Sequence, residues 1–504
     1  MDKNTLSFYT TADTAVLWWE KPETAAAHQT YEIFLDGKAA GTAEKTHAAI
    51  HGLKPQTKHT VTVQMPLPDV SSSSPKAGCG QAAAPGTGSL LLGQVTFCTP
   101  QAKRRIDVTA APYCASGDGR TMDTAALQKA IDDCGPDCAV YLPSGTYLTG
   151  ALRLHSDMEL YLEKDAVLQG SARPEDYLPR IHSRFEGIEM ECYQSLLNLG
   201  ELDHTAGPNC KNVIIQGEGI ICGGGKELAW STIESEWEKL KDYLAANAAL
   251  VATCENNNTI PGRVRGRLIN LSNCSNVRIS GLTLANGASW NVHMIYSDHI
   301  LTDHCTFKST GIWNGDGWDP DSSEHCTIFG CRFYTGDDSV AIKSGKNPEG
   351  NLINRPTRAI RIFDCFSAFG HGLCMGSEIS GGIEDVKIWD CDLENSMVGI
   401  EIKGTRKRGG YVRDIQVRDC IVPCLLAHSV GYNDDGVPAP EPPVFERLHY
   451  ERVTITGRSL DKEWTDCRAI ELRGFDADRH RIQDVTLKDV TITGGLGVYQ
   501  EYCD

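Results

Sequence analysis

Alternating hydrophobic and polar residues recur along most of this chain, and this pattern predicts strands rather than helices. From residue 277 onward one template returns: an alternating segment, a polar residue that is often Asp, and then a small or apolar residue. The template ends at Leu282, Cys305, Cys331, Cys365, Cys391, Cys420, Val453 and Val490, with spacings of 23, 26, 34, 26, 29, 33 and 37 residues. Such a repeat, without helical segments between its strands, fits the coils of a parallel β-helix better than a leucine-rich repeat or a propeller blade.

The region before the repeat predicts how the solenoid begins. Apolar residues at helical spacing over 123–131, after a polar start, predict a short amphipathic helix, and 140–147 reads as a strand and turn. A break in the repeat, rich in Glu, Lys and Ala, predicts a helical insertion near 225–260. We therefore expect an all-β fold in which residues 101–504 form a parallel β-helix that carries one helical insertion.

Residues 1–100 have a different pattern, with short alternating runs separated by polar turns. Asp36-Gly37 is a strong hairpin signal that follows the run 31–35. The segment resembles a fibronectin type III β-sandwich, with Trp19 and Tyr31 as core aromatic residues. Its expected role is that of a spacer or packing domain, and substrate binding is the alternative.

Composition and charge exclude several classes of protein. In 504 residues, 41% hydrophobic and 23% charged content is ordinary for a globular protein, and no run approaches the roughly 20 apolar residues of a membrane span. The net charge of −18 argues against a nucleic-acid partner, because phosphate binding requires clustered Lys and Arg. Residues 1–7 show no signal-peptide pattern, so a cytoplasmic location is expected, or a secreted or periplasmic one if the natural chain has a longer N-terminus.

Twenty cysteines are too dispersed for a small disulfide-rich domain. Five of them end the repeat template, which predicts an internal ladder of reduced thiols packed as small apolar residues. Cys134 with Cys138, or Cys420 with Cys424, are alternative disulfide or metal pairs, but no second pair completes a zinc pattern.

Four polar motifs interrupt the repeat: Asn314-Gly315-Asp316-Gly317, Gly336-Asp337-Asp338, Gly370-His371-Gly372 and Ile402-Lys403. Counted from the cysteine that ends the preceding template, the offsets are 6 for Asp337, 6 for His371, 11 for Asp316 and 12 for Lys403. Equal offsets mean stacked positions in a solenoid. We therefore expect these residues to form two neighbouring columns across four successive coils, within one surface patch.

These residue types fit glycoside hydrolysis, which needs one protonated carboxyl group for the leaving oxygen and one carboxylate that activates water or attacks. Three crowded aspartates, Asp316, Asp337 and Asp338, cannot all ionise without cost, because like charges raise the pKa of at least one of them. His371 can share a proton or a hydrogen bond with the acid, and Lys403 offers a cation for a sugar carboxylate. We expect the three aspartates and His371 to be the catalytic residues.

The four motifs, taken in this order and extended to Trp318-Asp319 in the first, resemble the signature of glycoside hydrolase family 28, the polygalacturonases. The resemblance covers roughly residues 105–495. It implies a right-handed parallel β-helix that cleaves the α-1,4-linked galacturonic acid backbone of pectin with inversion of configuration, without a metal or other cofactor. By motif, Asp337 would be the general acid, and Asp316 with Asp338 would hold and deprotonate the water. His371 would support the acid, and Lys403 would bind galacturonate.

One position departs from the family pattern. The fourth motif usually begins with Arg, whereas this chain has Glu401, and the run Arg406-Lys407-Arg408 follows shortly after. Arg406 or Arg408 could supply the missing cation, so Asn314, Lys403, Arg406 and Arg408 are the candidate substrate-binding residues. The departure indicates that the substrate is a modified, branched or otherwise non-standard galacturonide.

Three features resemble the exo-acting bacterial branch of the family: the segment 185–193, the helical insertion and the front domain. Extra loops in that branch close one end of the substrate groove. Arg263, Arg265 and Arg267, spaced by two, would present their guanidinium groups to uronates on one strand face, or would form a solvated edge.

The sequence is also compared with two other functions. A pectate lyase is also a parallel β-helix and cleaves the same polymer by β-elimination with Ca²⁺, but the Gly-His-Gly element and the paired aspartates have no role in that scheme. A non-catalytic carbohydrate-binding solenoid would need no stacked acids. The sequence leaves open the oligomeric state and the exact sugar and linkage.

Overall fold

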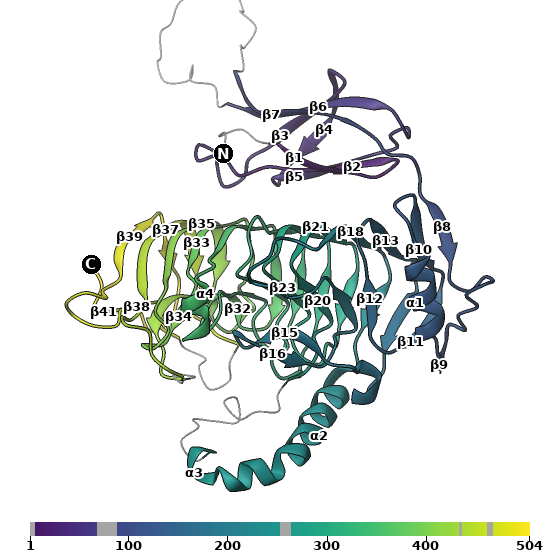
Figure 1. Ribbon diagram of the computed structural model, residues 1–504. Coiled ribbons are helices and arrows are strands. Elements are labelled where there is room, and N and C mark those ends of the chain that lie inside the picture. Colours follow the sequence, from purple (N-terminus) through teal and green to yellow (C-terminus); the bar gives the residue numbers. More distant parts are fainter. Residues whose placement is uncertain (1–5, 68–87, 252–263, 433–435, 461–466) are drawn as a thin grey trace, which may run out of the picture. The chain divides into compact units, whose positions relative to one another are not determined.

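The structure, a computed structural model, describes residues 6–67, 88–251, 264–432, 436–460 and 467–504, in two compact units, 1–104 and 105–504 (Figure 1). Unit 1 contains two antiparallel sheets. The three-stranded sheet consists of β1 (Ser7–Thr10), β2 (Thr14–Trp18) and β5 (His47–His51). The four-stranded sheet consists of β4 (Lys38–Ala43), β3 (Tyr31–Leu35), β6 (Lys58–Pro66) and β7 (Ser89–Cys98).

The core of unit 1 follows from its alternating pattern. Trp19 and Tyr31 are buried and meet edge-on, with ring centroids 5.2 Å apart. The predicted hairpin is confirmed: Asp36 and Gly37 both have positive φ, 51° and 77°, as a two-residue turn between twisted strands requires, and they join β3 to β4. The fibronectin type III assignment of this unit stays a prediction.

Unit 2 is the predicted right-handed parallel β-helix, which is built from three parallel sheets. Sheet I contains β8 (Arg104–Asp107), β10 (Cys138–Leu142), β13 (Met158–Leu162), β18 (Cys210–Gly217), β21 (Cys274–Ser280), β24 (Asp298–Asp303), β27 (Thr327–Phe329), β30 (Thr357–Phe363), β33 (Ile383–Trp389), β35 (Tyr411–Val422), β37 (Val444–Ile455), β39 (Gln483–Lys488) and, beside β37, β40 (Thr491–Ile492). Sheet II contains β9 (Asp118–Met122), β11 (Gly145–Thr149), β14 (Ala166–Gly170), β19 (Ile220–Cys222), β22 (Thr283–Ala285), β25 (Thr306–Lys308), β28 (Arg332–Tyr334) and β31 (Phe366–Phe369).

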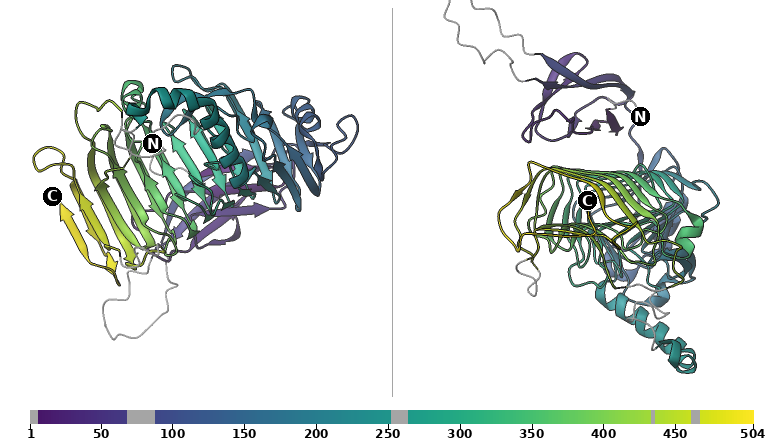
Figure 2. Two further views of the ribbon diagram at one scale, coloured as in Figure 1. Left: turned by 90° about the horizontal axis from the view of Figure 1, so that it is seen from below. Right: turned by 90° about the vertical axis from the view of Figure 1, so that its left-hand side faces the viewer.

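Sheet III carries the candidate site. It contains β12 (Leu152–Leu154), β17 (Leu197–Leu199), β20 (Ile269–Ser272), β23 (Val292–Ile295), β26 (Trp318–Asp321), β29 (Val340–Ile342), β32 (Gly372–Met375), β34 (Gly399–Gly404), β36 (Cys424–Ser429), β38 (Ile470–Arg473) and β41 (Val498–Glu501). Figure 2 shows the strands of successive coils stacked side by side in chain order. Residues far apart in sequence therefore become neighbours on one face of a sheet.

The repeat template has a simple structural cause. The residue that follows each alternating segment of sheet I adopts positive φ, as at Asp364 (48°), Asp390 (56°) and Asp419 (54°), a region that Asp and Asn tolerate better than most residues. This bend turns the next side chain inward; it follows the end of the strand at Asp364 and Asp390 and lies within the longer β35 at Asp419. The inward ladder of free thiols is Cys305, Cys331, Cys365, Cys391 and Cys420, all buried. Cys424 is also a free thiol, so the Cys420–Cys424 disulfide is absent.

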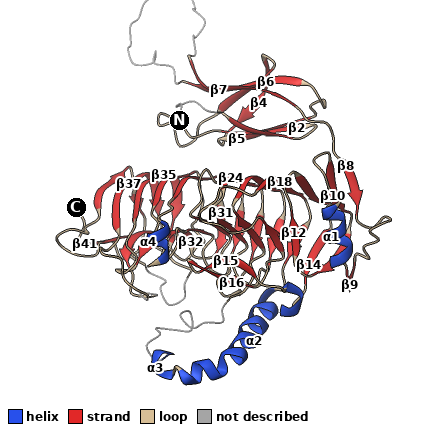
Figure 3. Ribbon diagram, in the orientation of Figure 1, coloured by secondary structure: helices blue, strands red, loops and turns tan. Residues whose placement is uncertain are grey.

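Helices occupy the start and one side of the solenoid (Figure 3). The predicted first helix is α1 (Thr124–Asp132), which lies against the first coils, and residues 174–177 form a 3₁₀ turn. The insertion contains α2 (Gly225–Ala246), which lies outside the coils, and α3 (Ala248–Val251), and a short helix α4 (Glu349–Ile353) follows β29. None of the helices in the described residues is both long and apolar enough to cross a membrane.

Candidate active site

Strand register in sheet III brings the candidate residues together. Strands β26, β29, β32 and β34 pair in parallel through one row of inward-facing residues, Trp318, Val340, Leu373 and Ile400. The residues two positions before this row, in the loops that enter the first three strands, are Asp316, Asp338 and His371. Three successive coils therefore place a carboxyl, a carboxyl and an imidazole in one column.

The predicted column is wrong for Asp316, because its offset from Cys305 placed it in the column of Lys403. The loop that enters β26 is longer than its counterparts, so Asp316 moves into the column of Asp338 and His371. The column of Lys403 continues through Gly376 on the preceding coil to Lys343, which follows β29 and pairs with Asp321 at the end of β26. Lys343 lies 12 residues after Cys331, the offset of Lys403 from Cys391, so the sequence contained the signal for this residue.

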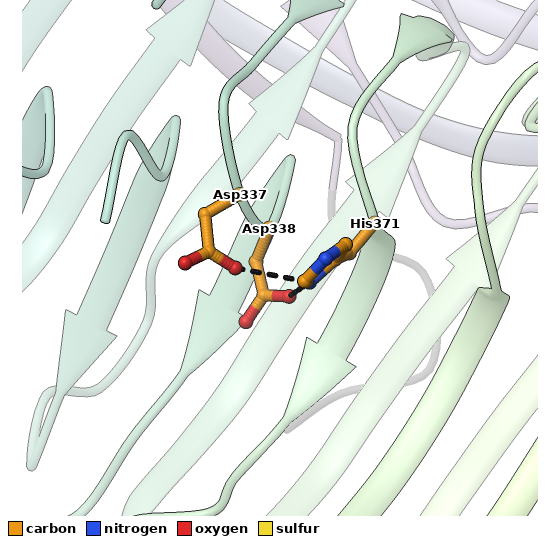
Figure 4. A group of neighbouring side chains, drawn as sticks. All are labelled: Asp337, Asp338 and His371. Carbon is orange, nitrogen blue, oxygen red and sulfur yellow. Dashed lines mark hydrogen bonds and ion pairs between the residues drawn. The ribbon is translucent and has the colours of Figure 1, made fainter. Parts of the chain in front are cut away.

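His371 links two of the predicted catalytic acids (Figure 4). Its Nδ1 lies 2.9 Å from Oδ1 of Asp337 and 3.1 Å from Oδ1 of Asp338. Carboxylates only accept hydrogen bonds, so Nδ1 must carry the proton and donate it to both. Burial opposes protonation, but the bonds to Asp337 and Asp338 outweigh it and raise the pKa of His371 to about 11. His371 is therefore a cation that holds two carboxyl groups in place.

Among the described residues, Asp337, Asp338 and His371 also form a group that could hold a metal ion. Each offers one ligand atom, and these atoms all lie within 4.8 Å of one another. A histidine nitrogen that binds a metal must be unprotonated. Nδ1 of His371 instead faces two acceptors and carries a proton. The donor set therefore fits a proton-sharing cluster rather than a metal centre.

Asp338 is held in its ionised form. Its burial would raise the pKa, but Lys403 and the His371 hydrogen bond lower it below the ordinary range. Nζ of Lys403 lies 3.5 Å from Oδ2 of Asp338, and the thiol of Cys374 donates to Oδ1 over 3.0 Å. Asp337 is more accessible than Asp338, with 26% of its side chain exposed against 6%. The two adjacent acids therefore differ in environment as acid and base roles require.

The third acid, Asp316, pairs with a buried lysine. Its Oδ2 lies 3.2 Å from Nζ of Lys343, and both side chains are 4% exposed. Burial, with repulsion from Asp337 and Asp338, raises the pKa of Asp316 against the opposing charge of Lys343. Asp319, on the strand β26 that follows Asp316, is completely buried, and burial together with Asp316 raises the pKa of its carboxyl group well above the ordinary range. Both carboxyl groups are therefore harder to ionise than isolated ones.

Replacing His371 with Asn should change stability in a pH-dependent way. Because the folded-state pKa of His371 is raised, its contribution to stability is complete below its unfolded value of about 6.5 and is lost as pH rises towards about 11. The difference in melting temperature between wild type and His371→Asn should therefore be largest near pH 5.5 and shrink steadily up to pH 10. His449→Asn, at an exposed position on β37, is the control. A difference that grows with pH would contradict the assignment.

Glu401, which stands where the family usually has Arg, lies on the outward face of β34 and is fully paired. Its Oε1 lies 2.8 Å from Nε2 of His428, and its Oε2 lies 3.2 Å from Nζ of Lys403. Burial opposes ionisation, but Lys403 and His428 lower the pKa of Glu401 to about 2. His428 also contacts Glu471 through Nδ1, at 3.2 Å, and its own pKa is raised against the effect of burial. Sequence reasoning missed His428, because no motif marks it.

The other predicted substrate ligands have mixed outcomes. Arg408 is 1% exposed, and it donates to the carbonyl of Ser377 and to Oδ1 of Asn347. Its guanidinium group is buried and already paired, which argues against the predicted role of Arg408 as a substrate ligand. The side chain of Arg406 is 55% exposed, pairs with Asp476 and donates to a backbone carbonyl, and its role stays a prediction.

Asn314 shapes the loop that carries Asp316. It adopts positive φ (52°), which Asn tolerates, and its Oδ1 accepts a hydrogen bond of 2.7 Å from Nη2 of Arg265. Arg265 also donates to the carbonyl of Trp313 and lies over the rings of Trp313 and Phe185. The buried guanidinium group of Arg265 therefore holds the loop that carries Asp316.

Arg265 and Arg267 are buried, so the predicted solvated edge is wrong for both, and a role towards uronates stays a prediction. Arg267 lies over the rings of Phe185 and Trp290. Arg263 lies outside the described residues. The exposed Trp230 of α2 stacks on Trp313 at 5.6 Å, which connects the helical insertion to the loop before Asp316.

A hairpin covers one part of sheet III next to the acids. Its strands are β15 (Ile181–Phe185) and β16 (Ile188–Cys192). Arg184 of the hairpin bonds Asp321 of β26 at 2.8 Å, and both side chains are completely buried. Phe185 stacks on Trp290 at 5.0 Å, and the backbone amide of Lys346 donates to the carbonyl of Gly187 at the hairpin tip. The outward face of β26 beyond Asp316 is therefore closed.

The opposite part of the same face is accessible. Beyond the acids, on β36 and β38, the exposed side-chain fractions are 13% for His428, 14% for Glu471 and 37% for Arg473, against 0% for Arg184 and Asp321 under the hairpin. Among the described residues, the side chains over β36 and β38 are thus more exposed than those under the hairpin. The face is closed on one side of the acids and accessible on the other.

Comparisons with known proteins agree with this geometry. A family model described as "Glycosyl hydrolases family 28" matches residues 186–425, and one described as "Rhamnogalacturonase A/epimerase, pectate lyase-like" matches residues 108–170. The chain is 35% identical over 395 residues to a probable polygalacturonase of Vitis vinifera, covering 75% of this chain and 72% of the relative. It is 28% identical over 482 residues to an exo-poly-alpha-D-galacturonosidase of Dickeya chrysanthemi, covering 87% and 79%. The Yersinia enterocolitica family 28 exopolygalacturonase shares the fold, with a TM-score of 0.80 at 23% identity over 97% of this chain and 92% of that one.

Proposed function

This chain belongs to glycosyl hydrolase family 28, and we propose that it hydrolyses α-1,4-linked galacturonic acid residues of pectic poly- or oligosaccharides from a chain end. The observation that carries the proposal is the column of Asp316, Asp338 and His371 with Asp337 beside it. Four groups from three coils meet at one accessible point of sheet III, and their environments separate a proton donor from a proton acceptor.

Asp337 is the general acid. It is the most accessible of the three acids, and His371 fixes its carboxyl group from one side, so the other oxygen is free to protonate the glycosidic oxygen. Asp338, kept ionised by Lys403 and His371, accepts the proton of the attacking water. Asp316 holds that water from the next coil. Attack by this water on the face opposite the leaving group inverts the anomeric configuration.

The ligand atoms of Asp337 and Asp338 lie within 4.8 Å of His371 and of one another. Inverting enzymes with two carboxyl groups usually separate them by about 6.5–9.5 Å to admit the water. In this chain the water is instead shared between Asp338 and Asp316, which belong to neighbouring coils. The short distance therefore does not indicate a covalent intermediate.

The closed end of the site supports attack at a chain terminus. The hairpin β15–β16 covers β26, on the coil that carries Asp316, whereas the face over β34, β36 and β38 is accessible. A polymer that lies on this face can extend in one direction from the acids. The sugar on the other side of the scissile bond meets the hairpin and leaves as a short product.

Incubation with polygalacturonate should release reducing ends without any unsaturated product that absorbs in the ultraviolet, and a chelator should not slow the reaction. Hydrolysis adds water across the bond, whereas β-elimination leaves a double bond and depends on Ca²⁺. Proton NMR of the first product should show the β-anomer, as inversion requires. An unsaturated product that disappears with chelator would instead establish a lyase. A protein that binds the polymer without forming any product would be a non-catalytic solenoid.

A further inference from the structure

Beyond the acids, the accessible part of sheet III has two columns of outward-facing side chains. In β34, β36 and β38 the inward residues belong to the core, so the alternate residues face out. The register gives the first column as Glu401, Leu426 and Glu471, and the second as Lys403, His428 and Arg473. Any sugar bound next to the acids on the polymer side must rest on the first members of these columns.

Every cation in these columns already has an acidic partner. Lys403 contacts Asp338 at 3.5 Å and Glu401 at 3.2 Å. His428 lies between Glu401 at 2.8 Å and Glu471 at 3.2 Å. Arg473 lies 3.6 Å from Glu471 and also donates to the carbonyl of Ser429. Together with Asp338, the columns contain three acids and three cations, so their formal charge is zero.

A sugar carboxylate placed here would meet Glu401 and Asp338 at close range. It could bind Lys403 or His428 only beside the carboxylates that these cations already contact, and like charges placed together disfavour binding. A hydroxyl group has no such conflict, because it can donate to Glu401 and accept from Lys403. The site is thus suited to hydroxyl groups and not to a second negative charge.

We propose that the sugar bound beside Glu401, on the polymer side of the scissile bond, carries no free carboxylate: it is a methyl-esterified galacturonate or a neutral sugar. The inference rests on the proposed function and names the substrate class of the same site. Glu401 is its specificity-determining residue. The enzyme would then remove a terminal galacturonate where the next sugar is esterified or neutral.

The test compares kcat/KM for four disaccharides: digalacturonate, its two mono-methyl esters and galacturonosyl-rhamnose. Whichever end of the chain is attacked, one of the two mono-esters has its ester on the polymer-side sugar. The comparison of the two mono-esters with digalacturonate therefore does not depend on chain direction. Wild type should cleave that mono-ester at least about tenfold better than digalacturonate, and the other mono-ester no better than digalacturonate. Galacturonosyl-rhamnose has its neutral sugar at the reducing end, so it tests a neutral polymer-side sugar for attack from the non-reducing end.

Two variants test whether Glu401 causes the preference for the polymer-side ester. Glu401→Gln removes the charge with little change of shape, and Glu401→Arg reverses it. Both should move the preference towards digalacturonate, by about tenfold or more for Glu401→Arg. Glu218→Arg makes the same change of charge at an exposed bend between β18 and β19 and should leave the ratio of the two rates unchanged.

Each outcome decides the matter. A wild-type preference for digalacturonate over both mono-esters would overturn the proposal. A preference for the polymer-side ester that neither Glu401 variant alters would overturn the assignment to Glu401. Failure to cleave any of the four disaccharides, with polygalacturonate also intact, would instead reject the proposed function on which the inference rests.

Discussion

Asp337→Asn should lower kcat on polygalacturonate by roughly 10²–10⁴-fold, because it removes the proton that the leaving oxygen needs. The fold should survive, since the amide oxygen of Asn can still accept the hydrogen bond from Nδ1 of His371, and the position is only partly buried. Release of reducing ends at saturating substrate measures kcat. Unchanged melting temperature would show that the loss is chemical.

The role of Asp337 can be separated from that of Asp338 with an activated substrate. A nitrophenyl galacturonide has a leaving group that departs without protonation, so Asp337→Asn should be nearly as active as wild type on it. Asp338→Asn should lose activity on both substrates, because the attacking water still needs its base. Asp137→Asn, at an exposed turn, is the matched control. Full activity of Asp337→Asn on polygalacturonate would refute the assignment of the acid.

The solenoid was predictable because its signal is repeated. Each coil contributes an alternating strand, a residue such as Asp364 that tolerates positive φ, and an inward residue such as Cys365, so one wrong assignment does not hide the pattern. The spacing of these units alone identified sheet I. The short strands of sheets II and III, many of them three or four residues long, gave weaker signals, and their pairing could not be counted from the sequence.

That the candidate acids meet was predictable from their motifs, but their columns were not. Asp316 was displaced in the count because the loop before β26 is longer than its counterparts, and sequence offsets measure chain length rather than height on the solenoid. His428 escaped notice for a different reason. Its importance comes from Glu401 on one side and Glu471 on the other, 27 and 43 residues away, and such a pairing exists only after the coils stack.

Buried charges were the least predictable part of the site. A run of alternating arginines such as Arg265 and Arg267 is ordinarily exposed, because burying a guanidinium requires compensation. Aromatic rings from separate elements provide part of it here, with Phe185 contributed by the hairpin and Trp290 by the segment before β23. Single-residue preferences cannot anticipate an environment that several distant segments build together.

The hairpin depends on one of these buried charges, and Arg184→Ala should release it. Arg184 and Asp321 are completely buried, 2.8 Å apart, and removal of one partner of a buried pair typically costs about 3–5 kcal/mol because the other charge remains. Detachment of β15–β16 would bring Asp321 back to water and avoid that cost. The closed end of the site would then open, and attack should shift from chain ends towards internal bonds. The measurement is the loss of viscosity of polygalacturonate per reducing end formed, which should rise.

Two further variants test this explanation. Arg184→Met combined with Asp321→Leu removes both charges and fills their volume, so it should restore the melting temperature that the single change lowers. Arg153→Ala breaks an exposed pair with Glu201, whose side chains are 53% and 77% exposed, and should cost at most about 1 kcal/mol. If Arg184→Ala left both the melting temperature and the product pattern unchanged, the hairpin would not close the site. Its buried ion pair would then have no part in choosing between terminal and internal bonds.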